Sequence, residues 1–505
     1  MKHIKKLASL LLVLVMVFAL ATTAFAEETT YSITINNSAE GHTYEAYQIF
    51  TGDLSGTTLS NIVWGSGVSE AGQAALGDAA AKAETLENEA DAKAFAKAVA
   101  PYLTTAAGSA NTVTDGKYVI SGLTAGYYLV KDQDGSLTGD NDSYTEYIIR
   151  VVGDVTATPK SDVPEVQKKV KDINDSTDTT KTNWQDSADY DIGDSIPFQL
   201  KATLADNVSS YTTYKVVFHD TLSKGLTYNN DAKVYIDGTE TNGFTVTADG
   251  TTTLTVSCDD VKALGAGNSS VITVEYTAKL NENAVLGSVG NPNEVYLEYS
   301  NNPNKSEEGN NETGETPKDV VIVFTYKTII NKVDGENQPL TGAAFKLEKL
   351  IKGEDGAEDT WTTVKEFTVD EITTSFTFSG LDDGRYKLTE TKTPAGYNTI
   401  APIYFVIEAA HDETADAPTL KTLNAYLTDA NGNKQTEMKE GESVNIDLGT
   451  VDLTAGSITT TVVNKSGSEL PSTGGIGTTI FYVLGGVLVL SAVVLLVTKK
   501  RMGNN

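Results

Sequence analysis

The sequence predicts an all-β chain of tandem β-sandwich domains, with one helical insert in the first domain. Short segments of alternating apolar and polar residues, such as 252–257 and 270–276, recur between turns rich in Gly, Asn and Asp. Thr, Val, Tyr and Ile dominate these segments, as is typical of β-strands. Because 505 residues are too many for one hydrophobic core, we expect several domains.

The composition excludes several classes of function. A formal charge of −30 argues against nucleic acid as a partner. A single cysteine, Cys258, rules out an internal disulfide, and the four histidines show no metal-binding spacing. The loops at 172–178 and 429–433 have side chains that suit calcium, but ordinary turns explain both more simply. We therefore expect no metal and no cofactor.

Both ends of the chain carry export signals. The first 26 residues combine three lysines, an apolar run and Ala24-Phe25-Ala26, which predicts a secretory signal peptide cleaved after Ala26. Residues 476–501 begin with an apolar run long enough to span a bilayer as a transmembrane helix, and end in Lys-Lys-Arg, which is typical of the cytoplasmic side. The body between these signals is therefore predicted to be secreted.

Composition also divides the body. Residues 70–103 are rich in Ala, Glu and Lys and predict one or two helices. A polar seam with prolines at 158–165 separates two domains, whereas 301–319 is interpreted as a loop, because the strand at 320–332 follows it and is expected to enter the next domain. The predicted divisions are a signal peptide (1–26), a first domain (27–160), a middle domain (161–327), a third domain (328–467) and a C-terminal signal region (468–505).

A weak internal repeat links the first and third domains. Residues 121–132 align with residues 379–390, and each segment is a turn followed by an alternating strand that ends in a carboxylate, Asp132 or Glu390. The two domains are therefore expected to share one immunoglobulin-like sandwich design.

Lys332 is an unexpected residue in the strand at 320–332. It lies on the same face as Ile330, Tyr326 and Phe324, which is the face that the pattern assigns to the core. An unpaired buried charge is costly, and such a group usually changes its protonation state instead. The alternatives are a lysine that reaches solvent at a strand end and an ordinary ion pair.

A motif near the C-terminus resembles the sorting signal Leu-Pro-x-Thr-Gly of Gram-positive surface proteins. It consists of Leu470, Pro471, Ser472, Thr473 and Gly474, directly ahead of the apolar run and the basic tail. The resemblance implies that a sortase cysteine attacks the Thr473 carbonyl, releases the chain from Gly474 onward and passes Thr473 to an amine. The alternative is a plain linker beside the membrane.

The third domain, over 328–467, resembles the collagen-adhesin B-type domains of Gram-positive pilins, most clearly in YKLTETKTPAGY, residues 386–397. In that family a strand lysine condenses with an asparagine of the last strand and releases ammonia. By motif position the resemblance implies that Lys332 joins Asn464, with Glu390 as the catalytic carboxyl. The chemistry needs a neutral Lys332, favoured because an apolar surround lowers an amine's pKa, and a protonated Glu390.

The middle domain resembles the middle domain of Gram-positive major pilins, over 190–228 and the strands around Asn293. Strand alternation turns Lys168, Asp220 and Asn293 toward the core. The resemblance then implies a Lys168–Asn293 bond promoted by Asp220. Lys169 remains the alternative lysine, and capping of the following turn remains the alternative role of Asp220.

The first domain departs from this pattern. Its opening strand has no lysine and the strand at 145–154 has no asparagine, so no such bond is expected in 27–157. Asp132 is expected to be an ordinary exposed or turn carboxylate.

Lys160 is the candidate that would join one subunit to the next. VTATPKSD resembles the pilin motif at Val155, Pro159 and Lys160, but departs from it at Ala157 and Thr158. The resemblance implies that this lysine attacks the sortase-held threonine of the next subunit. The alternative is a solvated linker lysine.

The sequence thus predicts a structural protein, the major subunit of a covalent pilus on the cell wall, and not an enzyme beyond its self-catalysed bonds. The implied partners are sortase, further copies of the chain and peptidoglycan, with minor pilins and host ligands as further candidates. The alternative is a wall-anchored adhesin or accessory pilin that does not act as an acceptor in polymerisation.

Overall fold

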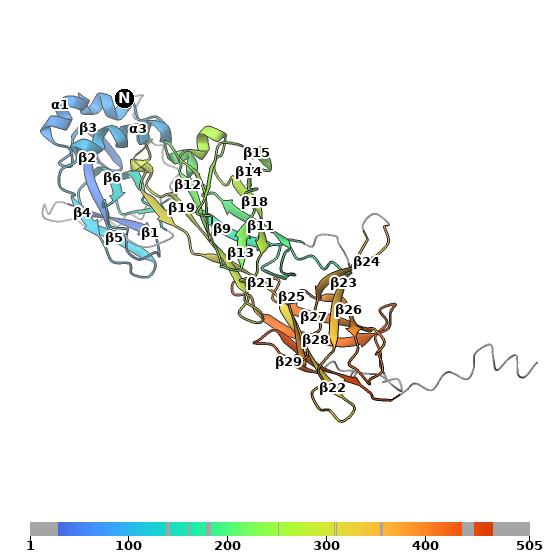
Figure 1. The fold of residues 1–505 in the computed structure, drawn as a ribbon. Helices are drawn as coiled ribbons and strands as arrows, with labels where there is room; N and C mark the ends of the chain where they lie inside the picture. The colour runs from blue at the N-terminus through green and yellow to red at the C-terminus, as the bar shows by residue number, and fades with distance from the viewer. Residues whose placement is uncertain are drawn as a thin grey trace, which may run out of the picture.

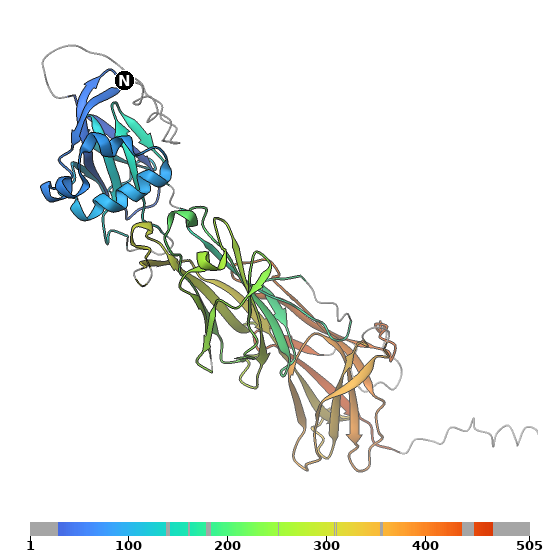
Figure 2. The same ribbon diagram turned by 90° about the horizontal axis from the view of Figure 1, so that it is seen from above.

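Three β-sandwich units follow one another along an elongated rod in this computed structural model (Figure 1, Figure 2). Among the residues that the structure describes, no helix is long and apolar enough to cross a membrane. The predicted signal peptide, sorting motif and membrane span lie outside the described residues. The described residues are 29–467 without 138–141, 160–161, 178–182, 251, 308, 310, 354–356 and 437–448.

The first unit has a three-stranded sheet in the order β5-β1-β8 and a second sheet in the order β3-β2-β6-β7, with β4 beside β2. Its strands are β1 (Tyr31–Asn36), β2 (Tyr44–Ser55), β3 (Thr58–Trp64), β4 (Gly108–Ala110), β5 (Lys117–Leu123), β6 (Gly126–Asp132), β7 (Glu146–Val151) and β8 (Val155–Ala157).

The helical insert covers the outer face of the second sheet. It forms three short helices instead of the predicted one or two, because Gly77 (φ 88°) ends the first and Asp78 and Asn88 cap the next two. Phe95 of the last helix stacks on Phe50 of β2, with ring centroids 5.4 Å apart, so this sheet is buried on both faces. The helices are α1 (Glu70–Leu76), α2 (Ala79–Glu84) and α3 (Glu89–Val99), followed by the 3-10 turn η2 (Ala100–Tyr102).

The middle unit packs a seven-stranded sheet against a six-stranded sheet around one core. The first sheet has the order β10-β21-β19-β12-β17-β16 with β20 beside β19, and the second has the order β15-β14-β18-β11-β9 with β13 beside β18. Its elements are β9 (Glu165–Val170), β10 (Ser187–Asp189), β11 (Ser195–Thr203), η3 (Val208–Ser210), β12 (Val216–Leu222), β13 (Leu226–Tyr228), β14 (Lys233–Ile236), β15 (Thr239–Thr241), β16 (Thr245–Ala248), β17 (Thr253–Cys258), η4 (Val261–Leu264), β18 (Val271–Leu280), β19 (Asn291–Ser300), η5 (Pro303–Lys305), β20 (Thr313–Glu315) and β21 (Asp319–Phe324).

The third unit packs a four-stranded sheet, β25-β22-β30-β29, against a five-stranded sheet, β24-β23-β26-β27-β28. The chain enters it without a break in direction, since only Thr325 separates β21 from β22, as the sequence predicts. Its strands are β22 (Tyr326–Asp334), β23 (Ala344–Ile351), β24 (Thr360–Glu366), β25 (Ser375–Leu381), β26 (Gly384–Lys392), β27 (Ile403–His411), β28 (Leu420–Thr428), β29 (Thr450–Asp452) and β30 (Ser457–Asn464).

The internal repeat corresponds to the same structural feature in the first and third units. In each unit the repeated segment joins the two sheets, from β5 to β6 and from β25 to β26. Gly122 and Gly380 occupy matching positions with φ of 79° and 76°, a conformation that favours glycine. In each unit the first strand also pairs in parallel with the last, β1 with β8 and β22 with β30. The predicted shared sandwich design is therefore confirmed.

These two glycines make a matched test of packing between units. Alanine at either position is strained by about 1–2 kcal/mol, because φ is left-handed. A Cβ at Gly122 would meet open space, whereas a Cβ at Gly380 would lie within 2.7 Å of the Ile192 side chain of the middle unit. Gly380→Ala should therefore cost about 1–3 kcal/mol more than Gly122→Ala. Calorimetry of the transition of each affected unit measures this difference, and equal losses would contradict it.

Candidate functional site

The middle unit brings together the three residues that the sequence selects. Lys168 on β9, Asp220 on β12 and Asn293 on β19 each have 0% exposure. Lys168 Nζ donates a hydrogen bond of 2.6 Å to Asp220 Oδ2. The three strands belong to both sheets, so strand alternation turns these side chains into the space between the sheets.

Tyr276 on β18 connects these three groups, and the sequence analysis missed it. Its hydroxyl donates to Asp220 Oδ2 at 2.8 Å and accepts from Asn293 Nδ2 at 2.8 Å and from Lys168 Nζ at 3.2 Å. The sequence does contain a signal for it, a tyrosine on the inward face of a strand. A buried phenol hydroxyl needs a polar partner, so this position indicates a polar contact in the core.

The electrostatics of this site favour the neutral forms of both charged groups. Burial lowers the pKa of Lys168 more than Asp220 raises it, and burial raises the pKa of Asp220 more than Lys168 lowers it. Asp220 Oδ1 and Asn293 Oδ1 are buried without a hydrogen-bond partner among the described residues. If Asp220 is protonated, its carboxyl has a hydrogen to donate, and Asn293 Oδ1 is a buried acceptor that lacks a donor.

The other residues that could take the roles of Lys168 and Asn293 form contacts elsewhere, and Asp220 does not cap the following turn. The side chain of Lys169 is 30% exposed and forms an ion pair with Asp186. Asn291, also buried on β19, uses its amide on the backbone of Val285 and Val323. The Asp220 carboxylate contacts Lys168 and Tyr276 instead of the turn that follows β12.

The third unit brings together a second set. Lys332 on β22 and Asn464 on β30 have 0% exposure, and Glu390 on β26 has 6%. Asn464 Nδ2 donates to Glu390 Oε1 at 3.0 Å and to Oε2 at 3.1 Å. Asn464 Oδ1 is buried without a partner among the described residues. The carboxyl and the amide are therefore in direct contact here.

Lys332 is buried beside the last strand. Its Nζ donates to the backbone oxygens of Val333 (2.9 Å) and Val462 (3.1 Å), and not to the Glu390 carboxylate. Burial lowers the pKa of Lys332 to about 8, although Glu390 and Asp334 act in the opposite direction. A lysine that reaches solvent at a strand end does not fit this burial.

The prediction for Asp132 in the first unit was wrong. Asp132 has 2% exposure, and its carboxylate contacts His42 Nδ1 at 2.7 Å, Thr145 N at 2.7 Å and Thr145 Oγ1 at 3.0 Å. Burial alone would lower the pKa of His42, but Asp132 and Asp142 outweigh it and raise the pKa to about 9. The matching carboxylate of the first unit is therefore buried in an ion pair with a histidine.

The residues that are predicted to join one subunit to the next are not among those that the structure describes. Lys160 and the motif residues Leu470, Pro471, Ser472, Thr473 and Gly474 lie outside the described residues. Thr158 and Asp162, which flank Lys160 between β8 and β9, are exposed.

Cys258 and two loops are the remaining features that the sequence analysis named. Cys258 is buried, with 9% exposure. Asp429 accepts from the backbone of Asn431 and Asn433, so the loop at 429–433 is the ordinary turn that we predicted. The loop at 172–178 is different, because several of its side chains contact the third unit.

The lowered pKa of Lys332 predicts a dependence of stability on pH. In an Asn464→Ala variant, Lys332 should stay a free buried amine with a pKa near 8, against 10.5 in the unfolded chain. Between these values the unfolded chain binds more protons, so the free energy of unfolding should rise with pH. Denaturant unfolding at about pH 7.5 and about pH 9.5 measures this rise.

The matched control is the Asn464→Ala/Lys332→Met double variant, which has no titrating amine at this position. The rise with pH should be smaller in the double variant. The same pH dependence in both proteins would show that Lys332 titrates normally.

Comparisons with known proteins find families that match parts of the chain. Three family models match the chain: a Gram-positive pilin backbone subunit 2, Cna-B-like domain over 192–303, a prealbumin-like fold domain over 327–421, and an LPXTG cell wall anchor motif over 462–502. The first two models cover the parts of the middle and third units that hold Asp220 and Glu390, and the third begins just before Asn464.

Relatives of known identity extend the match over most of the chain. The trypsin-resistant surface T6 protein of Streptococcus pyogenes serotype M6 is 27% identical over 445 residues, 77% of each chain. The solved T6 backbone pilin of that serotype matches with a TM-score of 0.55 and 17% identity, over 88% of this chain and 100% of that one. The major pilin SpaD from Corynebacterium diphtheriae has a TM-score of 0.48 and 19% identity, over 88% and 99%. The pilin models, the anchor motif and the similarity to the T6 protein together support a Gram-positive backbone pilin that is anchored to the cell wall as a surface pilus protein.

Proposed function

We propose that this backbone pilin forms the shaft of a covalent pilus, in which sortase joins Thr473 of one copy to Lys160 of the next. Two intramolecular amide bonds, Lys168–Asn293 and Lys332–Asn464, reinforce the middle and third units. The observation that best supports the proposal is the fully buried Lys168, which contacts Asp220 and shares the Tyr276 hydroxyl with Asn293.

The bond in the middle unit forms by attack of the neutral Lys168 Nζ on the Asn293 side-chain carbonyl carbon. Asp220, protonated at the start, donates to the amide oxygen and then transfers protons from the attacking amine to the leaving nitrogen. The new C–N bond replaces the old one, and one molecule of ammonia is released. Tyr276 acts as a positioning residue, since its hydroxyl contacts all three groups.

The third unit supports the same reaction from a different starting arrangement. Lys332 pairs with Val462 across the parallel strands, so Lys332 and Asn464 project from the same face of the sheet. Glu390 already contacts Asn464. Rotation of the Lys332 side chain away from the two backbone carbonyls is the remaining step before attack.

The proposed acceptor lies at the junction of the first and middle units. Two other lysines near it are engaged: Lys169 pairs with Asp186, and Lys171 lies over the Trp184 ring with Nζ 4.7 Å from its centroid. Pro159 has no backbone N–H to donate to a sheet, which favours an irregular segment accessible to an enzyme. Lys160 is the preferred acceptor for these reasons.

The alternative function is that of an accessory pilin or adhesin that sortase attaches to the wall but that accepts no further subunit. Both functions need the sorting motif and permit the internal bonds. Only the shaft function needs an acceptor lysine, so Lys160 distinguishes them.

The internal bonds predict a mass deficit. The purified body, residues 27–467, should weigh two molecules of ammonia less than its sequence requires. Asp220→Ala and Glu390→Ala should each restore one molecule of ammonia, because each removes the carboxyl of one site. Intact-mass spectrometry measures these differences.

Asp132→Ala is the matched control, because it removes the corresponding carboxyl of the first unit and should leave the deficit at two. Tyr276→Phe should slow formation of the Lys168–Asn293 bond by roughly tenfold without preventing it. A wild-type protein with the full sequence mass would refute both cross-links.

The shaft function predicts a ladder of high-mass species in cell-wall extracts under denaturing conditions. Lys160→Arg should abolish this ladder while monomers still reach the wall, because the guanidinium is not a nucleophile at neutral pH. Lys171→Arg is the matched control and should leave the ladder intact. If the ladder survives in Lys160→Arg, another lysine is the acceptor, and if the wild type forms none, the accessory function is correct.

A further inference from the structure

The joint between the middle and third units is unusually acidic. The middle unit contributes carboxylates from the loop after β9 and from the region around β10, and the third unit contributes two from the turn between β25 and β26. Three groups of these side chains lie close enough to hold an ion, and in each group the ligand atoms are within 4.8 Å of one another. They are Asp172, Asp189 and His411; Asp175, Asp191 and Asp194; and Asp189, Asp382 and Asp383.

Two cations of the protein's own, Lys349 and His411, contact the three groups and are shared among them. Lys349 Nζ on β23 lies 2.5 Å from Asp191 and 3.5 Å from Asp175, and it also contacts Asp382 at 3.0 Å. Burial alone would lower the pKa of Lys349, but these carboxylates raise it well above its usual value. Lys349 therefore remains charged and neutralises the second group.

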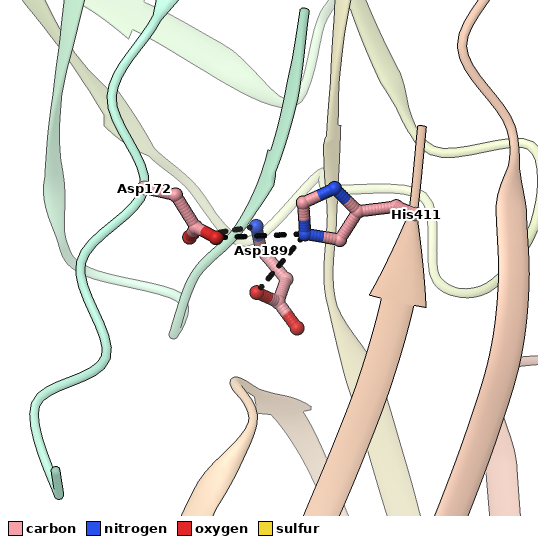
Figure 3. A group of neighbouring side chains, drawn as sticks. All are labelled: Asp172, Asp189 and His411. Carbon is pink, nitrogen blue, oxygen red and sulfur yellow. Dashed lines mark hydrogen bonds and ion pairs between the residues drawn. The ribbon is translucent and has the colours of Figure 1, made fainter. Parts of the chain in front are cut away.

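His411 at the end of β27 neutralises the first group. Its Nε2 lies 3.5 Å from Asp172 Oδ2 and 3.7 Å from Asp189 Oδ1, and Figure 3 shows the ring pointing toward both carboxylates. Its Nδ1 lies 2.8 Å from Ser187 Oγ. Burial opposes protonation, but the two carboxylates raise the pKa of His411 to about 10. The histidine is thus a charged partner and not a metal ligand.

The third group keeps an excess of negative charge. Seven carboxyl groups face one lysine and one histidine among the described residues of the joint. Asp189 Oδ2 has no hydrogen-bond partner among the described residues, although Asp189 is only 2% exposed. The hydroxyl of Tyr326 is also buried without such a partner; burial raises its pKa most, and the nearby Asp189 carboxylate raises it further.

We propose that Asp189, Asp382 and Asp383 bind a calcium ion that bridges the middle and third units. Carboxylate oxygens from two elements, with the Tyr326 hydroxyl beside them, are the hard donors that calcium accepts in flexible geometry. The orphaned Asp189 Oδ2 supplies the unused lone pairs. Magnesium fits less well, because it demands a near-ideal octahedron and keeps most of its water.

The three proposed ligands come from both units. Because Asp189 comes from β10 and the other two from the β25–β26 turn, the ion would hold the two units in one relative orientation.

The test is calcium binding to the body, residues 27–467, after treatment with EDTA. Calorimetric titration with calcium chloride should show one site per chain, with a lower affinity for magnesium chloride. Calcium should also raise the melting temperature, because it binds only the folded joint. Asp383→Asn should weaken calcium binding at least about tenfold, since the charge count of the ligands sets the affinity.

Two further measurements keep the proposal open to refutation. Asp429→Asn, in the exposed loop at 429–433, is the matched control and should bind calcium like the wild type. The rise in melting temperature that calcium causes should be smaller in Asp383→Asn than in the wild type.

Three outcomes would overturn the proposal. No binding at about 5 mM calcium, above the usual range of extracellular calcium modules, would exclude the site. Loss of binding in Asp429→Asn but not in Asp383→Asn would place the ion elsewhere. An equal calcium-induced rise in melting temperature in the wild type and in Asp383→Asn would mean that Asp383 only anchors Asn174, to which it is hydrogen bonded. Asp189→Asn serves as the second variant if Asp383→Asn does not fold.

Discussion

The contact between Lys168 and Asp220, both fully buried, is the interaction on which the chemistry that we propose for this protein depends. A buried lysine and carboxylate lose more hydration free energy than their attraction usually returns, so such a pair is a poor way to stabilise a fold. The same desolvation moves both groups toward their neutral forms, which a condensation with Asn293 requires. The core therefore tolerates a group that costs stability until, as we propose, the reaction removes its charge.

The two proposed bonds would reinforce their units in different ways. Lys168–Asn293 would join the edge strand of one sheet to an inner strand of the facing sheet, whereas Lys332–Asn464 would join two adjacent parallel strands of one sheet. Each bond closes a loop of more than a hundred residues, worth about 4–5 kcal/mol by analogy with disulfides. In the third unit the chain enters through β22 and leaves through β30, so tension along the rod would pass through the bond and not through the sandwich core.

Strand alternation and motif position were enough to select Lys168, Asp220 and Asn293, because the face of the sheet to which a strand side chain points follows from the local sequence pattern. The same reasoning failed where the partner comes from another part of the chain. Asp132 is buried because His42, from a segment that precedes β2, supplies a charge that no local pattern reveals. Tyr276 was missed because an inward tyrosine is usual in a β-sandwich, and only the assembled core shows that its hydroxyl contacts three reactive groups.

The acidic joint was missed for the same reason, and it explains how separate units can form one rod. Asp172 and Asn174 lie in a loop that the sequence assigns to a simple turn, but their partners are His411 and Asp383, more than two hundred residues later. The continuous strand through Thr325 fixes one line of contact between the units but leaves rotation about that line. Contacts between other elements of the two units, made by Lys349, His411 and the proposed calcium ion, would oppose this rotation. Covalent bonds would then keep each unit folded, while electrostatic contacts would set the angle between units, so the stiffness of the shaft should depend on ions even where its integrity does not.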